Sequence, residues 1–311
     1  MINDRITHAV IEATSRCNFK CPFCAGRYLS SGDMSLDKYK MVLSQLPNLK
    51  YLYLSGEGEG FLNQHFFRMA LIAKEKGILL FHVTNGSLLN QKRINQIMEI
   101  GFEEINISTE TLKADRFWRI RGGDWRQIKL NIKELASRRG QIKKPVIRIN
   151  FNVLKSSFYE IEDVIELSQD LEIELPNLFW LQNKDDYRQF YPAELEKEIL
   201  SLKERQTVLE YIHKYSAPSV FWGSLYNSNR HKPCPFLNSF IWVSQDGKIA
   251  PCCYIKRYDQ LDMGNAFDDN GIITALTKPI INELDIGLRN NIASCFCTNC
   301  TVIELHRWKD K

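Results

Sequence analysis

The sequence predicts an α/β fold of parallel strands alternating with helices, followed by a smaller C-terminal region built around a β-hairpin. Three observations lead to this prediction. Short apolar or β-branched runs recur along the first part of the chain, stretches with helical periodicity lie between them, and the pattern changes near Ala217. Alternation of this kind is typical of parallel βαβ units.

Six segments have the length and composition of buried strands. They are His8 to Ala13, Tyr51 to Ser55, Leu79 to Thr84, Glu104 to Ser108, Val146 to Val153 and Asn177 to Leu181. Helical periodicity marks Leu36 to Leu46, His65 to Lys76, Gln91 to Ile100, Trp125 to Arg138 and Phe158 to Asp170. Six units are fewer than the eight of a closed barrel, so the pattern fits a partial barrel or an open doubly wound sheet.

The chain changes character after the sixth predicted strand. Pro192 to Tyr215 reads as one long amphipathic helix, and Ala217 to Pro235 is rich in aromatic residues, Asn, Ser and Pro. Beyond it, Phe240 to Ser244 and Lys248 to Ala250 flank an Asp-Gly turn, which predicts a hairpin. We therefore expect one domain over residues 1–216 and a second over residues 217–311.

Composition narrows the class of protein. The 311 residues carry a net charge of +4 and 44% apolar residues, without an apolar run long enough to span a membrane. There is no block of like charges that would indicate a nucleic-acid arm, and Met1 to Arg5 does not resemble a secretion signal. We expect a cytoplasmic protein without membrane or nucleic-acid partners. In such a compartment, nine cysteines indicate metal ligands or catalysts.

Three of the cysteines directly follow the first predicted strand. Cys17, Cys21 and Cys24 are spaced C-x3-C-x2-C. Three thiolates can hold a four-iron cluster and leave one iron without a protein ligand, free to bind a small molecule. The alternative is structural zinc, which prefers four ligands and paired C-x2-C motifs, so this spacing fits zinc poorly.

With the aromatic residue Phe23 before Cys24, this motif resembles the signature of the radical S-adenosylmethionine (SAM) superfamily. The resemblance covers Ile6 to about Leu181 and implies a partial (β/α)6 TIM-like barrel. It further implies a 4Fe–4S cluster on the three cysteines, whose open iron binds the amino and carboxylate groups of SAM. Electron transfer, from a donor such as flavodoxin or ferredoxin, then cleaves SAM to methionine and a 5′-deoxyadenosyl radical.

The segment after the second predicted strand, Leu54 to Glu59, looks like the family's Gly-Gly-Glu segment. The resemblance makes Gly56, Gly58 and Glu59 candidate SAM contacts, with Glu59 on the amino group. Glycine lets backbone approach a ligand closely. Glu57 and Gly60 depart from the family pattern, and an acidic turn is the alternative interpretation.

Three later segments add further candidate SAM contacts. Asn85 lies in a Thr-Asn-Gly run after the third predicted strand, and Ser108 ends the fourth. Asn150 and Asn152 lie on the fifth, where alternation places both on one face that either contacts SAM or packs.

Six cysteines lie in the C-terminal region: Cys234, Cys252, Cys253, Cys295, Cys297 and Cys300. The arrangement C-x17-C-x44-C-x2-C, with a glycine five residues before Cys252, resembles the twitch domain, a shortened SPASM domain, over Lys232 to His306. The resemblance implies one auxiliary 4Fe–4S cluster held by Cys234, Cys252, Cys297 and Cys300. Two pairs of thiolates also suit a zinc ribbon.

Cys253 adjoins a predicted ligand and remains free for chemistry. A thiol has a weak S–H bond, so Cys253 could return a hydrogen atom to a substrate radical, as in radical SAM epimerases. The alternatives are that Cys253 is a small buried hydrophobic residue or that it replaces Cys252 as a cluster ligand. The sequence thus predicts epimerisation of a natural product, either an aminoglycoside or other sugar or a ribosomal peptide.

Two other functions stay open. One is a two-electron oxidation, either dehydrogenation or cross-linking, with the auxiliary cluster as electron acceptor. The other is a non-catalytic iron–sulfur or zinc protein. Aromatic and polar candidates for lining a substrate cavity are Trp180, Tyr187, Trp222, Tyr226 and His231.

Overall fold

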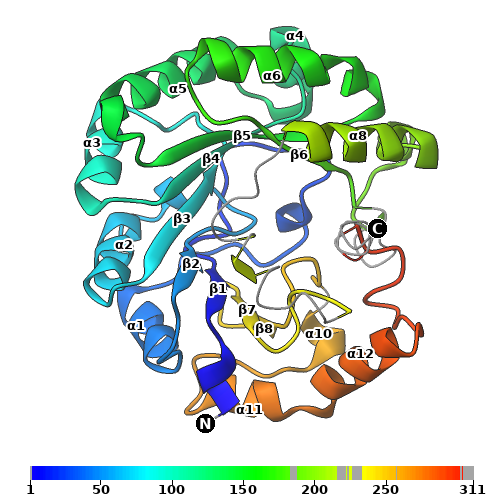
Figure 1. The fold of residues 1–311 in the computed structure, drawn as a ribbon. Helices are drawn as coiled ribbons and strands as arrows, with labels where there is room; N and C mark the ends of the chain where they lie inside the picture. Colours follow the sequence, from blue (N-terminus) through cyan, green and yellow to red (C-terminus); the bar gives the residue numbers. More distant parts are fainter. Residues whose placement is uncertain are drawn as a thin grey trace.

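The computed structural model describes residues 2–182, 188–215, 222, 224–225, 233–256, 258–301 and 303. Its centre is one curved, open sheet whose strands are ordered β6-β5-β4-β3-β2-β1-β7-β8. Each neighbouring pair from β6 to β7 is parallel, and β8 is antiparallel to β7. The partial barrel that the sequence predicted is thereby confirmed (Figure 1).

The strands are β1 (His8–Ile11), β2 (Tyr51–Tyr53), β3 (Leu79–Thr84), β4 (Glu104–Thr109), β5 (Val146–Val153), β6 (Asn177–Trp180), β7 (Phe240–Val243) and β8 (Ile249–Ala250). The α-helices are α1 (Leu36–Ser44), α2 (Phe66–Glu75), α3 (Gln91–Ile100), α4 (Ala114–Arg121), α5 (Trp125–Arg139), α6 (Ile161–Asp170), α8 (Leu202–Tyr215), α10 (Tyr258–Leu261), α11 (Gly271–Thr277) and α12 (Pro279–Arg289). Short 3-10 helices are η1 (Ile2–Arg5), η2 (Ala25–Arg27), η3 (Gly60–Leu62), η4 (Gly140–Ile142), η5 (Lys155–Glu160) and η6 (Ala193–Glu198).

Alternation along the strands separates an apolar outer face from a more polar inner face. In β5, Ile147, Ile149 and Phe151 are fully buried. Asn150 and Asn152 alternate with them and are half-buried. Because successive strand side chains point to opposite faces, the apolar set packs under the surrounding helices and the asparagines face the inside of the barrel.

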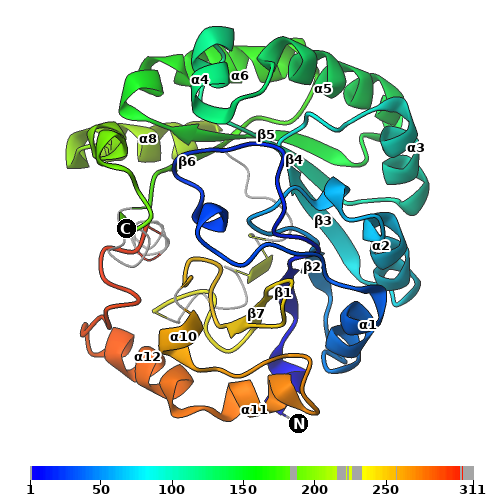
Figure 2. The ribbon, with the colours of Figure 1, turned by 180° about the vertical axis from the view of Figure 1, so that it is seen from behind.

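The C-terminal hairpin continues the barrel sheet. Strand β7 pairs in parallel with β1, with His8 beside Phe240 and Val10 beside Trp242. The sheet is therefore continuous from barrel to hairpin, and the end of β1 that leads to the first cysteines lies next to the hairpin. Helices α11 and α12 lie beside the hairpin (Figure 2). Helices α4, α5 and α6 lie on the opposite side of the barrel opening (Figure 2). Ala217, near the expected domain boundary, is outside the described residues.

The expected continuous helix from Pro192 to Tyr215 is wrong. The segment forms η6 and then α8, which begins after Ser201. The Ser201 hydroxyl accepts from the backbone N–H of Glu204 at 3.3 Å, while the Glu204 carboxylate accepts from the backbone N–H of Ser201 at 2.7 Å. This reciprocal pair is a capping box, which starts a new helix.

Helix α4 was not predicted. It ends at Arg121 and is followed by Gly122, whose φ of +80° is a left-handed conformation that suits glycine. In the part of the chain that the structure describes, no helix is both long and apolar enough to cross a membrane.

Candidate functional site

The first three cysteines lie on the loop between β1 and α1, at the carboxyl ends of the barrel strands. This is the end where barrel folds carry their active sites. Figure 2 shows the loop, with η2, across the opening of the barrel. Loops that follow β2, β3 and β4 meet it there, and each cysteine has its own set of neighbours.

Cys17 is held by the loop after β3. Its sulfur accepts from the backbone N–H of Phe19 at 3.4 Å and from the side-chain amide of Asn85 at 3.8 Å. Asn85 also donates to the side chain of Asn18 at 2.9 Å. Burial raises the pKa of the Cys17 thiol, and the nearby Glu59 carboxylate raises it further. Asn85, a predicted SAM contact, therefore also fixes the cysteine loop.

Cys21 lies near a buried cation. Burial raises the pKa of its thiol to about 11, and the charge of Arg121 opposes this increase. The Arg121 guanidinium donates two hydrogen bonds of 2.5 Å to Glu110. It also lies over the ring of Phe23, at 6.0 Å. Phe23 packs against a small apolar cluster that comprises Leu154, Leu181 and Leu195.

Cys24 lies against the loop after β2. Its thiol is 3.6 Å from the backbone carbonyl of Glu57 and 3.5 Å from Oε2 of the Glu57 carboxylate. Burial is the largest cause that raises the pKa of this thiol well above its usual range, and Glu57 is the next. The other carboxylate oxygen of Glu57 forms an ion pair with Lys256 at 2.7 Å.

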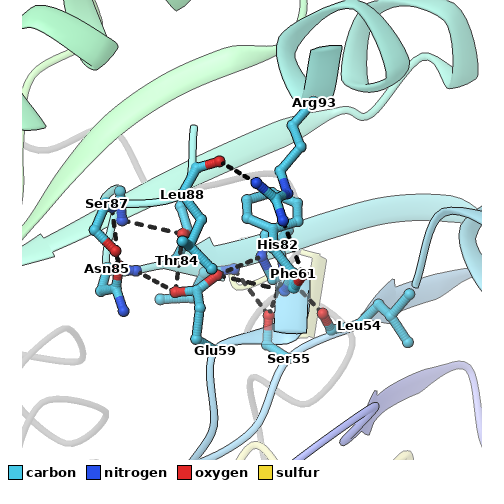
Figure 3. Close-up of polar contacts among 12 residues, drawn as sticks. Leu54, Ser55, Glu59, Phe61, His82, Thr84, Asn85, Ser87, Leu88 and Arg93 are labelled. Atoms are coloured by element: carbon cyan, nitrogen blue, oxygen red, sulfur yellow. Dashed lines mark hydrogen bonds and ion pairs between the residues drawn. The ribbon is translucent and has the colours of Figure 1, made fainter. Parts of the chain in front are cut away.

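Glu59 connects the loops after β2 and β3 (Figure 3). Its carboxylate accepts from the Thr84 hydroxyl at 2.9 and 3.0 Å and from the backbone N–H of Asn85 at 2.8 Å. His82 Nε2 is 3.9 Å from the same carboxylate. Glu59 is only 2% exposed. The predicted SAM contact is thus already engaged in fixing the position of Asn85.

Gly56 and Gly58 are required by packing within the chain. A Cβ on Gly56 would lie 2.3 Å from the Glu12 side chain. A Cβ on Gly58 would lie 2.2 Å from the backbone oxygen of Thr14. Close approach to a ligand was the expected reason for these glycines, but protein atoms occupy the space that a side chain would need.

Ser108 and Asn150 are neighbours on the inner face of the barrel. They are paired in register across β4 and β5, and both are half-buried. Asn177 of β6 donates to Asn150 at 2.9 Å and to Asn106 at 3.2 Å. Asn150 therefore has a packing role, and the wall around it is rich in hydrogen-bonding groups.

The cysteine loop fits the donor set of a four-iron cluster. Its three sulfurs come from one loop, and no fourth cysteine lies nearby in sequence. Among the described residues, no three His, Cys, Asp or Glu side chains surround a single point closely enough to hold one metal ion.

Four of the C-terminal cysteines line a common cavity: Cys234, Cys252, Cys297 and Cys300. The rest of the lining is apolar and includes Phe236, Ile255 and Leu284. Burial raises the pKa of Cys234 well above its usual range, and the other three thiols add to this effect. Four sulfur donors in an apolar cavity fit a fully ligated cluster. These are the four cysteines that the twitch resemblance selected.

Cys253 and Cys295 are not among the cavity-lining residues. Cys295 is exposed, whereas Cys253 is half-buried. Burial and the neighbouring Cys252 raise the pKa of Cys253, while the charge of Lys256 lowers it. Cys253 therefore lies near Lys256, whose ion pair partner Glu57 contacts Cys24.

The predicted aromatic lining is only partly described. Trp180 is buried, and Trp222 stacks on Tyr53 of β2 with ring centroids 5.8 Å apart. Tyr187, Tyr226 and His231 lie outside the described residues.

Three residues of the site were not predicted from the sequence: Glu12, Arg121 and Lys256. Glu12 is 3% exposed and accepts from the backbone N–H of Glu57 at 2.6 Å. A carboxylate at the end of a buried strand could have identified it. Lys256 gave no local signal, because its partner Glu57 is far away in the sequence.

Comparisons with known proteins agree with this geometry. The radical SAM superfamily matches residues 11–167. A tungsten-containing aldehyde ferredoxin oxidoreductase cofactor-modifying protein of Pyrococcus furiosus is 26% identical over 53% of this chain. That match spans 48% of the Pyrococcus protein, about half its length. A GTP 3′,8-cyclase of Helicobacter pylori is 25% identical over 93% of this chain and 94% of its own.

Among solved structures, SuiB of Streptococcus suis bound to S-adenosylmethionine shares the fold, with a TM-score of 0.70. It is 15% identical, and the match covers 90% of this chain and 68% of SuiB. SuiB has also been solved with the precursor peptide SuiA. From the matched residues and the cysteine motif within them, the chain belongs to the radical SAM superfamily.

Proposed function

We propose that this radical SAM enzyme removes a hydrogen atom from an sp3 carbon of a natural product and that Cys253 returns one to the opposite face. The reaction is then an epimerisation, and Cys253 is its catalytic residue. Cys17, Cys21 and Cys24 hold the 4Fe–4S cluster and leave one iron for SAM. When bound, the cluster and SAM supply the 5′-deoxyadenosyl radical.

The proposal is supported by the position of Cys253 outside the lining of the cavity that four other C-terminal cysteines share. Cys234, Cys252, Cys297 and Cys300 line one cavity. Four thiolates complete an auxiliary 4Fe–4S cluster and leave no iron open, so its role is electron transfer. Cys253 interacts with the Cys252 thiol and with the charge of Lys256, and Lys256 in turn pairs with Glu57.

The hydrogen balance defines what Cys253 must do. The substrate loses one hydrogen atom to the radical, which yields 5′-deoxyadenosine. Cys253 then breaks its S–H bond and forms a new C–H bond, and its sulfur becomes a thiyl radical. One electron and one proton restore the thiol. A reduced flavodoxin or ferredoxin would supply this electron, as well as the electron that cleaves SAM.

Oxidation is the second candidate, favoured by the same complete set of four cysteines. A fully ligated cluster suits acceptance of an electron from the substrate radical. The product would then lose two hydrogen atoms overall by dehydrogenation or cross-linking. A non-catalytic iron–sulfur or zinc protein is less consistent with the loops at the first cluster, where Asn85, Arg121 and Glu57 each lie next to one cysteine.

The substrate belongs to one of two classes in this proposal. A ribosomal peptide is supported by the fold shared with SuiB, which has been solved with its precursor peptide. An aminoglycoside or other sugar is supported by the amide-rich inner wall around Asn106, Asn150 and Asn177. A cytoplasmic location and division into a barrel of residues 1–216 and an auxiliary domain of residues 217–311 are part of the same proposal.

Mass spectrometry of product formed in deuterated water tests this function. Thiol hydrogens exchange with solvent, so an epimerase adds one deuterium to its product, and Cys253→Ala should abolish that gain while 5′-deoxyadenosine is still made. The exposed Cys295→Ala is the matched control and should keep the gain. A product lighter by two hydrogens, without deuterium, would replace epimerisation by oxidation. Failure of the wild type to make any 5′-deoxyadenosine would refute both.

A further inference from the structure

A buried ion pair joins the cysteine loop to the C-terminal hairpin segment. Lys256 Nζ is 2.7 Å from Glu57 Oε1, and the Lys256 side chain is only 1% exposed. Glu57 follows β2, whereas Lys256 follows β8 and comes shortly after Cys252 and Cys253. The pair therefore connects the first cluster site with the segment that carries the auxiliary ligands.

The Glu57 carboxylate lies between a cation and a predicted cluster ligand. Oε1 faces Lys256 at 2.7 Å, and Oε2 is 3.5 Å from the sulfur of Cys24. The Glu57 backbone carbonyl is also 3.6 Å from that sulfur. Any charge on this carboxylate thus acts directly on Cys24, and Lys256 is positioned to neutralise it.

The surroundings fix Lys256 in place. Its ammonium lies over the ring of Trp242, 3.6 Å from the centroid, a cation–π contact. Glu12, at the end of β1, accepts from the Glu57 backbone at 2.6 Å and adds a second carboxyl to the group. Tyr258 is also close enough to interact with Lys256. A lysine held by an aromatic ring and a carboxylate in a buried site cannot easily move away.

The electrostatic consequence follows from the charges. Reduction adds an electron to a cluster, so a nearby carboxylate opposes reduction and a nearby cation favours it. These effects are strong where water is excluded. An unpaired Glu57 beside Cys24 would make the first cluster harder to reduce, and Lys256 removes this penalty.

We propose that Lys256 is a positioning residue that sets the reduction potential of the first cluster by neutralising Glu57 beside Cys24. This inference rests on the first cluster of the proposed function. Lys256 belongs to the segment that carries Cys252 and Cys253, so this segment contributes a charge to the surroundings of Cys24.

A redox titration followed by electron paramagnetic resonance tests the proposal on the reconstituted full chain. At a fixed potential, Lys256→Met should lower the ratio of reduced to oxidised first cluster about tenfold, a shift of about 59 mV for one electron. Glu57→Gln should shift the ratio in the opposite direction. The double variant should lie near the wild type, and Lys256→Arg should largely restore the wild-type ratio.

Lys248→Met is the matched control, because Lys248 pairs with Asp246 on the same hairpin but its side chain is 47% exposed. It should leave the ratio unchanged. A purely structural pair would lower iron content in both single variants without opposite shifts. Shifts of one sign, or none, in variants that keep their iron would overturn the inference. If Lys256→Met does not fold, Glu57→Gln and the double variant still decide the sign.

The outcome is separable from that of the proposed function. If the wild type binds no cluster and makes no 5′-deoxyadenosine, the proposed function itself fails. If the wild type cleaves SAM but Lys256→Met and Glu57→Gln leave the potential unchanged, only the role of Lys256 fails.

Discussion

Glu104 makes the stability of the barrel depend on pH. It begins β4, is 1% exposed and faces the inside of the barrel. Burial raises its pKa from 4.5 to about 7, although Asn106 donates to it at 2.9 Å and Arg148 lies 4.0 Å away. The folded protein therefore binds the Glu104 proton more tightly than the unfolded chain does.

The sign and size of the effect follow from linkage. A carboxyl whose pKa is raised in the folded state contributes its full stability below about pH 4.5, and this is lost as the pH rises through about 7. At about 1.36 kcal/mol for each pKa unit, the loss is on the order of 3 kcal/mol. For a chain of this size that corresponds to about 5 °C in melting temperature.

Glu104→Gln should remove this dependence. The carbonyl of the introduced amide can still accept from Asn106, so the contact persists without a titratable group. We expect the melting temperature of the variant, relative to wild type, to be about 5 °C higher at pH 8.5 than at pH 4.5. The matched control is Glu75→Gln, at an exposed position on α2. The difference in melting temperature between this variant and wild type should be the same at both pH values. Equal pH profiles for wild type and Glu104→Gln would show that burial of this carboxyl does not shift its pKa.

Three further substitutions test the loops around the first cluster. Gly58→Ala would place a Cβ 2.2 Å from a backbone oxygen. We expect this clash to lower the free energy of unfolding by about 1–3 kcal/mol, measured by thermal melting. An unchanged melting temperature would contradict this packing. Arg121→Met leaves the buried Glu110 unpaired and should lower the free energy of unfolding by about 3–5 kcal/mol. The double variant Arg121→Met/Glu110→Gln should recover part of this loss of stability. No recovery would contradict the pairing. Glu59→Gln weakens the contacts to Thr84. It should lower both the melting temperature and the affinity for SAM measured by equilibrium binding. Wild-type values of both would show that Glu59 neither stabilises the loop nor binds SAM.

Most of the barrel could be predicted because its pattern is local. Alternating side chains define β5 over Val146–Val153, with the predicted bounds. The pairing of β7 with β1 could not be predicted, because hydrogen bonds between distant strands leave no mark on the sequence around either one. The break before α8 was visible only in the Ser201 and Glu204 capping pair, which amphipathic periodicity conceals.

For the site too, residues close together in the sequence could be predicted, whereas contacts between distant segments could not. Spacing alone pointed to Cys17, Cys21 and Cys24, because ligands on one loop are close in sequence. The choice of four C-terminal cysteines depended on family resemblance, and the cavity brings those four together. The ion pair of Glu57 and Lys256 could not be predicted, because it depends on two loops that meet only in the folded chain.

The proposed function requires two iron–sulfur clusters, one held by the three N-terminal cysteines and one held by four C-terminal cysteines. The iron, zinc and sulfide content after anaerobic reconstitution tests this requirement directly. The proteins to compare are the wild type, a variant without Cys17, Cys21 and Cys24, and the double variant Cys297→Ala/Cys300→Ala. We expect about twice as much iron in the wild type as in either variant, with matching sulfide and little zinc. The two-cluster proposal would be wrong if Cys297→Ala/Cys300→Ala kept all the iron of the wild type, or if zinc took the place of the second cluster.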